Sequence, residues 1–169
     1  NAIHAFQAVG DMATEKGKIS VYVIRSGQLE IDEDKTAIDG FEISDNGIGF
    51  TDENRESFDP LYSDLKIKEG GKGFGRFICL KYFENLTVIS DYKDGDAFKR
   101  RAFAMGKQND IIVNERITPS DSKQTGATIK LSPVRSGTFP DKQLKTIATN
   151  LVEKLLPFFI TKRFVCPGE

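Results

Sequence analysis

The sequence predicts an α/β fold in a single domain, and three observations point to it. The 169 residues, of which 38% are hydrophobic and 13 are Phe, are enough to close one ordinary core. Apolar and polar side chains alternate at residues 19–24, as in a strand that is buried on one face. Apolar side chains recur at helical spacing at residues 74–82 and 141–156, and no internal repeat divides the chain.

The N-terminal part of the chain is predicted to contain one helix and two strands. Residues 2–9 are strong helix formers apart from the aromatic positions, and Gly10 is suited to end the helix. The strand at residues 19–24 is followed by a second strand at residues 36–44. The polar residues 27–35 are expected to connect the two strands as a hairpin.

A long polar loop separates two predicted helices in the middle of the chain. Residues 52–58 are suited to a short acidic helix. Residues 59–72 are polar, contain Pro60 and show no periodicity, and loops of this length inside compact domains are usually functional or disordered. From Phe74 to about Phe83 the apolar residues return to helical spacing, so a second helix is expected to begin on a glycine cluster.

Strands dominate the rest of the sequence, ahead of one C-terminal helix. Residues 94–96, Asp-Gly-Asp, are typical of a tight turn that joins two strands as a hairpin. The C-terminal helix is predicted at residues 141–156. The four strands predicted in this part lie at residues 86–92, 97–105, 111–117 and 126–132.

The composition argues against several classes of protein. The 24 Lys and Arg residues are balanced by 25 Asp and Glu residues, so no general electrostatic attraction to nucleic acid is indicated. Cys79 and Cys166 are far apart and lack metal-ligand spacing, which argues against a zinc site and against a disulfide-stapled secreted fold. The apolar stretch at residues 155–160 is too short to span a bilayer. We expect a cytoplasmic protein without a membrane partner.

Both ends of the sequence look like cuts. Asn1 starts the chain without Met and leads directly into the first predicted helix. Residues 164–169 end the chain without an obvious closing element. We therefore expect the chain to be a piece of a longer protein.

An acidic residue followed by two glycines stands at the end of the second predicted strand. Residues 45–50 read DNGIGF. The carboxylate of Asp45 can accept a hydrogen bond from the exocyclic amine of adenine, whereas guanine presents a carbonyl group there, so the motif favours ATP over GTP. Gly47 and Gly49 lack Cβ, so the backbone can turn sharply and a purine can approach it closely. The alternative is an ordinary Asp-Asn-Gly turn.

A second glycine cluster precedes the helix predicted from Phe74. Residues 70–75 read GGKGFG, and their alternate glycines expose backbone N–H groups at the positive end of the helix dipole, which suits phosphate. The cluster is not a Walker loop, because Lys72 is followed by Gly73 instead of Ser or Thr. It is a poor Rossmann fingerprint, because a charged loop at residues 62–69 precedes it instead of a strand. The alternative is a flexible glycine hinge.

Taken together, these motifs resemble the ATP-binding domain shared by DNA gyrase, heat-shock chaperones of the gyrase type, histidine kinases and MutL. Residues 1–5, NAIHA, resemble the helical N box of this superfamily. Residues 45–50 resemble its first glycine box and residues 71–75 its second. Residues 58–66 resemble the lid segment of histidine kinases, and residues 125–128, TGAT, resemble the final Gly-Thr box.

The resemblance, which runs from residue 1 to about residue 133, implies the Bergerat fold. This fold is a two-layer α/β sandwich in which helices cover one face of a mixed, mostly antiparallel sheet. Residues 1–169 are then expected to form a single ATP-binding domain, with residues 51–72 as a lid over the nucleotide. In the superfamily, lid closure creates a surface for dimerisation or for neighbouring domains, so slow hydrolysis works as a timed switch. The expected partners are other domains of the same chain and a nucleotide-dependent homodimer.

The resemblance also implies a site for ATP or ADP with Mg²⁺. Asn1 would offer its carboxamide oxygen to Mg²⁺, a hard cation that prefers oxygen ligands. Asp45 would hold adenine, the backbone N–H groups of residues 73–75 would bind phosphate, and Lys72 would add positive charge. The complete set of expected nucleotide-binding residues is Asn1, Ala5, Asp45, Gly47, Gly49, Phe50, Gly71, Lys72, Gly73, Phe74, Gly75 and Thr128.

Two positions depart from the pattern of the superfamily. In members that hydrolyse ATP, a Glu one helical turn before the N-box Asn activates the attacking water. That position precedes Asn1, so the catalytic residue is unknown here and hydrolysis is inferred from the resemblance. Ala127 stands where many members carry Thr, and Thr128 is expected to substitute, although neighbouring residues of a strand face opposite sides.

Several functions therefore stay open. A nucleotide-binding regulatory module would bind ATP without hydrolysing it. The catalytic half of a histidine kinase agrees with the lid segment but needs a His-bearing dimerisation helix upstream. A chaperone-like or MORC-like ATPase would carry further domains downstream.

Overall fold

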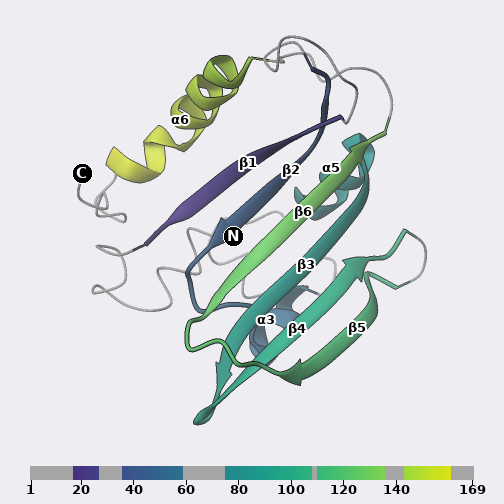
Figure 1. Cartoon of the computed structure of the whole chain (residues 1–169), viewed down its shortest axis with the longest axis vertical. Coiled ribbons are helices and arrows are strands. Elements are labelled where there is room, and N and C mark those ends of the chain that lie inside the picture. Colours follow the sequence, from purple (N-terminus) through teal and green to yellow (C-terminus); the bar gives the residue numbers. More distant parts are fainter. Residues whose placement is uncertain (1–16, 27–35, 59–74, 108–109, 136–142, 161–169) are drawn as a thin grey trace.

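The structure, a computed structural model, describes residues 17–26, 36–58, 75–107, 110–135 and 143–160 (Figure 1). Within these ranges the chain forms six strands and three helices. In chain order they are β1 (Ile19–Arg25), β2 (Ile38–Asp45), α3 (Asp52–Phe58), α5 (Gly75–Tyr82), β3 (Phe83–Asp94), β4 (Ala97–Met105), β5 (Ile112–Pro119), β6 (Gly126–Val134) and α6 (Leu144–Ile160).

Most elements predicted from the sequence are confirmed. All six predicted strands are present, and the helices expected at residues 52–58, 74–83 and 141–156 correspond to α3, α5 and α6. Two boundaries differ most from the prediction. β3 begins at Phe83, directly after α5, and is longer than the predicted strand, and α6 begins and ends three to four residues later than the predicted helix. The predicted helix at residues 2–9 lies outside the described residues, as do residues 59–74.

The six strands form one sheet in the order β1-β2-β6-β3-β4-β5. All five pairings are antiparallel, so the described part of the expected mixed sheet is antiparallel throughout. β6 comes last in the chain but lies between β2 and β3, as Figure 1 shows. This insertion places Ala127 opposite Asp45 and opposite Ser90.

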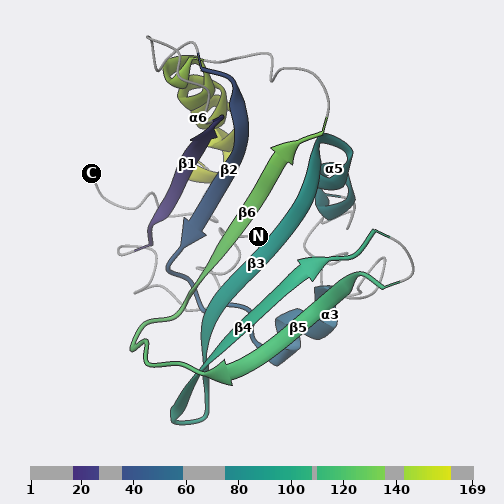
Figure 2. The same ribbon diagram turned by 45° about the vertical axis from the view of Figure 1, so that its right-hand side comes forward.

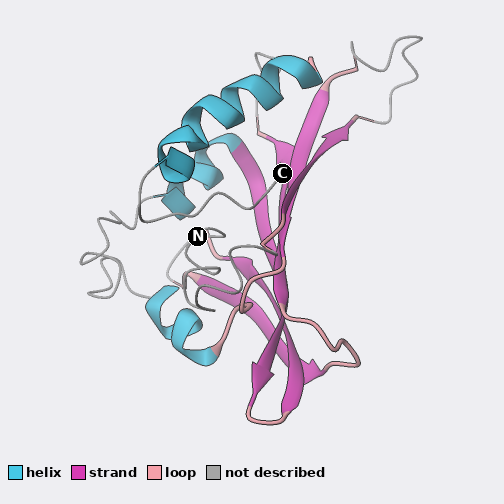
Figure 3. Cartoon of the chain, turned by 90° about the vertical axis from the view of Figure 1, so that its left-hand side faces the viewer, coloured by secondary structure: helices cyan, strands magenta, loops and turns pink. Residues whose placement is uncertain are grey.

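The three helices lie on one face of the sheet, which confirms the two-layer sandwich (Figure 3). Two clusters of buried side chains fill the space between the layers. The first lies around β3 and β4 and includes Phe58 of α3, and Cys79 and Leu80 of α5 pack against it. The second lies around β2 and includes Ile147 of α6. Figure 2 shows α6 beside β1 and β2. The buried members are Phe58, Leu86, Val88, Phe103 and Met105 in the first cluster, and Ile38, Phe41, Phe83 and Ile147 in the second.

The alternation of side chains along β3 distinguishes the two faces of the sheet. Leu86, Val88, Ser90 and Tyr92 are buried, whereas Ile89 between them is half exposed. Side chains two residues apart point to the same face of a strand, so the buried set faces the helices. The opposite face carries Ile89 and its neighbours, and no helix of the described residues covers it (Figure 3).

Local sequence explains the ends of several elements. Thr51 caps α3, because its Oγ1 accepts a hydrogen bond from the Asn54 N–H at 3.2 Å. The β3–β4 hairpin turns at Gly95, whose φ of 59° lies in the left-handed region, as the Asp-Gly-Asp sequence predicts. Among the described residues, no helix is long and apolar enough to cross a membrane.

Candidate functional site

Asp45 is the last residue of β2, and its side chain lies on the helix-covered face of the sheet. Phe41 of the same strand is buried against α6, and side chains four residues apart along a strand point to the same face. Asp45 Oδ1 accepts a hydrogen bond from the Gly47 N–H at 3.0 Å, which closes the turn after β2. The carboxylate is thus fixed at the point where the strand ends and the first glycine motif begins.

Burial sets the electrostatic character of Asp45. It raises the pKa of this carboxyl group above the ordinary value of 3.8, and hydrogen bonds from the backbone of Gly47 and Ala127 partly offset the effect. An ionised carboxylate can accept about four hydrogen bonds, so two backbone N–H groups leave capacity for a ligand. A half-buried carboxylate of this kind is suited to bind an amine N–H group.

Gly49 brings the turn after β2 into contact with β3. Its φ is 79°, in the left-handed region that side chains disfavour. A Cβ atom at this position would lie 2.3 Å from the carbonyl oxygen of Asp91 and 2.9 Å from Ser90 Oγ. Only glycine therefore fits here without displacing the backbone of β3.

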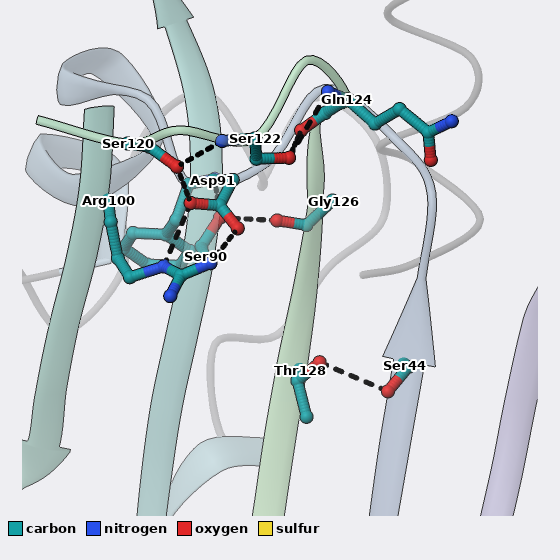
Figure 4. Close-up of polar contacts among 10 residues, drawn as sticks. Ser44, Ser90, Asp91, Arg100, Ser120, Ser122, Gln124, Gly126 and Thr128 are labelled. Carbon is teal, nitrogen blue, oxygen red and sulfur yellow. Dashed lines mark hydrogen bonds and ion pairs between the residues drawn. The ribbon is translucent and has the colours of Figure 1, made fainter. Parts of the chain in front are cut away.

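The hydroxyl group of Ser90 ties three segments together at this point. Ser90 is buried in β3, with 1% of its surface exposed. Its Oγ accepts a hydrogen bond from the Phe50 N–H at 2.7 Å. It also donates one to the carbonyl oxygen of Gly126 at 2.7 Å (Figure 4). The end of the first glycine motif and the start of β6 are thereby held to the same atom.

Arg101 of β4 binds the three residues that follow Gly49, which are Phe50, Thr51 and Asp52. Its side chain is 2% exposed, and its Nη1 donates hydrogen bonds to the carbonyl oxygens of Phe50 and Thr51, both at 2.8 Å. Nη2 forms an ion pair with Asp52, the first residue of α3. Nε lies 3.1 Å from Glu115 Oε1, within ion-pair range although the atoms are not aligned for a hydrogen bond.

Neither Ser90 nor Arg101 is among the site residues predicted from the sequence. Each sits in a run of alternate buried positions: Ser90 lies between Val88 and Tyr92, and Arg101 lies two residues before Phe103. The alternation of a strand predicts an apolar residue at both positions. A polar or charged residue there is the signal that could have identified Ser90 and Arg101 from the sequence.

Thr128 lies on the other face of the sheet from the Asp45 carboxylate. Its hydroxyl is 3.0 Å from the hydroxyl of Ser44, its cross-strand partner (Figure 4). The residue of β6 that shares the face of Asp45 is Ala127. The Thr128 hydroxyl and the Asp45 carboxylate therefore point to opposite faces of the sheet, although both residues line one hollow at this end of β2.

A polar network occupies the same outer face, close to Thr128. Arg100 donates two hydrogen bonds to the carboxylate of Asp91, at 2.9 and 2.7 Å, and Ser120 Oγ donates a third at 2.6 Å (Figure 4). The hydrogen bond from Arg100 holds the pKa of Asp91 below its ordinary value. An open hollow here is lined by Ile89, Asp91 and Arg100, by residues 122 and 124–128, and by Asp45 and Asn46 at the end of β2. The hollow therefore extends from the polar network of the outer face to the strand end that carries Asp45.

The remaining predicted site residues divide into two groups. Gly75 begins α5, as expected for the last residue of the second glycine motif. Asn1 and Ala5 of the N box lie outside the described residues. The same holds for the other predicted phosphate-binding residues, which are Gly71, Lys72, Gly73 and Phe74.

Comparison with known protein families places the sheet in a family context. The family described as "Histidine kinase-, DNA gyrase B-, and HSP90-like ATPase" matches the chain over residues 1–134. A search of curated proteins found no match. The matched range contains β1 to β6 together with α3 and α5, and ends at the last residue of β6.

Proposed function

The chain belongs to the family of histidine kinase-, DNA gyrase B- and HSP90-like ATPases, and we propose that it binds ATP together with Mg²⁺ at the turn after β2. In this proposal, slow hydrolysis drives closure of a lid at residues 51–72 and a conformational or dimerisation switch in a larger protein. The observation that carries the proposal is the Asp45 carboxylate, which is half-buried, oriented by the Gly47 N–H and set beside a turn that only glycine can form.

Asp45 has the chemistry to recognise adenine. The exocyclic amine of adenine donates a hydrogen bond, and the carboxylate accepts one. Guanine presents a carbonyl oxygen at the same place, and two acceptors facing each other in a partly desolvated site would be unfavourable. The first glycine turn, Gly47 to Phe50, would supply the backbone surface against which the purine lies.

The phosphates would bind at the start of α5. This helix begins at Gly75, so the backbone N–H groups of the glycine cluster would lie at its positive end. Lys72 would add charge, and Asn1 would hold Mg²⁺ together with the phosphate oxygens. Mg²⁺ would neutralise charge on the phosphates. These roles rest on the family and on the helix boundary, because Asn1 and Lys72 lie outside the described residues.

Two finer alternatives share the same pocket. A regulatory module would bind ATP without hydrolysis, and a histidine kinase would transfer the phosphoryl group to a His of another segment. The general base expected one helical turn before Asn1 distinguishes the first alternative from an ATPase. A cytoplasmic location stays a prediction that rests on the two widely spaced cysteines.

Calorimetric titration with Mg²⁺-ATP tests the proposal. We expect Asp45→Asn to weaken ATP binding by about 1–3 kcal/mol, the cost of a mismatched buried polar contact. Asp91→Asn is the matched control, since Asp91 is also a carboxylate near the end of a strand but lies on the outer face. Unchanged ATP affinity in Asp45→Asn, or an equal loss in Asp91→Asn, would contradict the assignment of Asp45.

A further inference from the structure

We propose that Ser90 and Arg101 are positioning residues for the adenine end of the site. We call them the anchor pair. They hold the turn that follows Asp45 in the geometry that binds the purine. They do so by binding the backbone of Phe50, the last residue of that turn, and not by contacting the ligand. This inference rests on the proposed function, because it assigns a role to side chains that do not themselves reach the ligand.

The anchor pair is a single structural unit of the sheet. Ser90 of β3 and Arg101 of β4 are direct cross-strand partners, and both side chains are buried on the helix side, with exposures of 1% and 2%. Buried polar side chains are retained at low cost only when their hydrogen bonds are made. Most of the partners they use here belong to residues 50–52, directly after the glycine turn, and the others are Gly126 of β6 and Glu115 of β5.

Phe50 is held on both sides of its backbone. Its N–H donates to Ser90 Oγ at 2.7 Å, and its carbonyl oxygen accepts from Arg101 Nη1 at 2.8 Å. Gly49, the preceding residue, lies so close to the carbonyl oxygen of Asp91 that a Cβ atom would not fit. The turn from Gly47 to Phe50 therefore has little freedom as long as both members of the anchor pair are in place.

Arg101 extends this restraint into α3. The same Nη1 also binds the carbonyl oxygen of Thr51, and Nη2 pairs with Asp52. Glu115 of β5 lies between Arg101 and Arg55 of α3, with its Oε2 atom 3.3 Å from Arg55 Nε. A planar guanidinium group can serve several acceptors at fixed angles, which an ammonium group cannot do. Arg101→Lys would therefore keep the positive charge but could not make all of these contacts at once.

The side chain of Phe50 is held as well, by packing against two other aromatic rings. The ring of Phe50 lies 5.4 Å from that of Phe58 at the end of α3 and 5.0 Å from that of Phe103. Phe103 follows Arg101 on the same face of β4. Phe50 and both ends of α3 are thus attached to the strands that carry the anchor pair. In the proposed function, the movement of the lid would then fall on the residues that follow Phe58.

A positioning role predicts a specific pattern of binding defects. Greater freedom of the turn after Asp45 should lower the affinity for adenosine, ADP and ATP by the same factor, because all three ligands share the purine. A defect in phosphate binding would instead grow with the number of phosphates. A role confined to folding would lower the melting temperature and leave the affinity of the folded protein unchanged.

The test is calorimetric titration of the full chain with adenosine, Mg²⁺-ADP and Mg²⁺-ATP, well below the melting temperature of each variant. We expect Arg101→Lys and Ser90→Ala each to lower the affinity for all three ligands by about tenfold, the equivalent of one or two lost hydrogen bonds. Arg100→Lys is the matched control, since Arg100 is the neighbouring residue, also pairs with a carboxylate and points to the other face. It should bind all three ligands like the wild type.

Three outcomes would overturn the inference: wild-type affinity in both anchor variants, an equal loss in Arg100→Lys, or a loss confined to ATP. If Arg101→Lys does not fold, Ser90→Ala decides alone, because it removes two hydrogen bonds and only one oxygen atom. Failure of the proposed function looks different. In that case the wild-type chain itself binds none of the three ligands, and the role of the anchor pair falls with it.

Discussion

Two opposing effects act on the carboxylate of Asp45: burial disfavours its charge, and backbone hydrogen bonds favour it. A half-buried carboxylate loses hydration when it is charged, which is why burial raises its pKa, and two backbone groups return only part of that loss. Because the folded-state pKa is raised, the charged form lowers stability at neutral pH, and this cost fades as the pH falls. A ligand that donates a hydrogen bond would relieve the same cost. The proposed binding role would explain why a carboxylate that lowers stability stands at this position.

The raised pKa of Asp45 gives a pH dependence with a definite sign. ATP binding should be strong above the pKa of the folded-state carboxyl group and should weaken as the pH falls through it, because the protonated group no longer matches the adenine amine. The decline should begin above the ordinary aspartate value of 3.8. Calorimetric titration from neutral to acid pH measures it. Asp45→Asn controls for protonation of adenine itself, and parallel profiles for the two proteins would contradict the role of Asp45.

Gly49→Ala should be among the most damaging single substitutions in the site. Its Cβ would lie 2.3 Å from the carbonyl oxygen of Asp91, and φ is 79°. We expect a loss of about 3 kcal/mol or more in the free energy of unfolding. Gly95→Ala is the control, because Gly95 also has positive φ but no atom within 4 Å of the added Cβ. It should cost only about 1 kcal/mol. Urea unfolding that showed equal losses would exclude the predicted clash.

At the scale of elements, the position of β6 organises the site. It pairs with β2 on one side and with β3 on the other, which brings Gly126 next to Ser90 and places Ala127 opposite Asp45. A Cβ atom on Gly126 would lie 2.3 Å from the carbonyl oxygen of Asp45, so the strand enters the sheet in close contact with the end of β2. The glycine turn, β3 and β6 therefore form one connected frame.

Helix α6 lies beyond the residues that the family matches, yet it completes the core over β2. Ile147 is 7% exposed and packs with Ile38, Phe41 and Phe83. We expect Ile147→Ala to lower the free energy of unfolding by about 3 kcal/mol. Val152→Ala, on the same helix at 60% exposure, should change it by less than about 0.5 kcal/mol. Similar values for the two variants in urea unfolding would show that α6 is not part of the cooperative core.

At the scale of the whole molecule, the sequence predicts the elements better than their arrangement. Periodicity locates the strands and helices, because each hydrophobic pattern is local. The position of β6 between β2 and β3 depends on pairing between residues far apart in sequence, which periodicity does not report. The same holds for the site: the acidic turn is visible in the sequence, whereas the partners of Ser90 and Arg101 come from three different segments. The face of Thr128 is likewise fixed by its register with Ser44.

In the proposed function, the chain recognises adenine through the carboxylate of Asp45. The most direct test of this claim is a comparison of ATP with inosine triphosphate, whose purine carries a carbonyl oxygen in place of the amine, on the wild type and on Asp45→Asn. We predict that the wild type prefers ATP by about tenfold or more, and that Asp45→Asn loses or reverses this preference, because the Asn amide can donate to the carbonyl oxygen. The same preference for ATP in both proteins would contradict the claim.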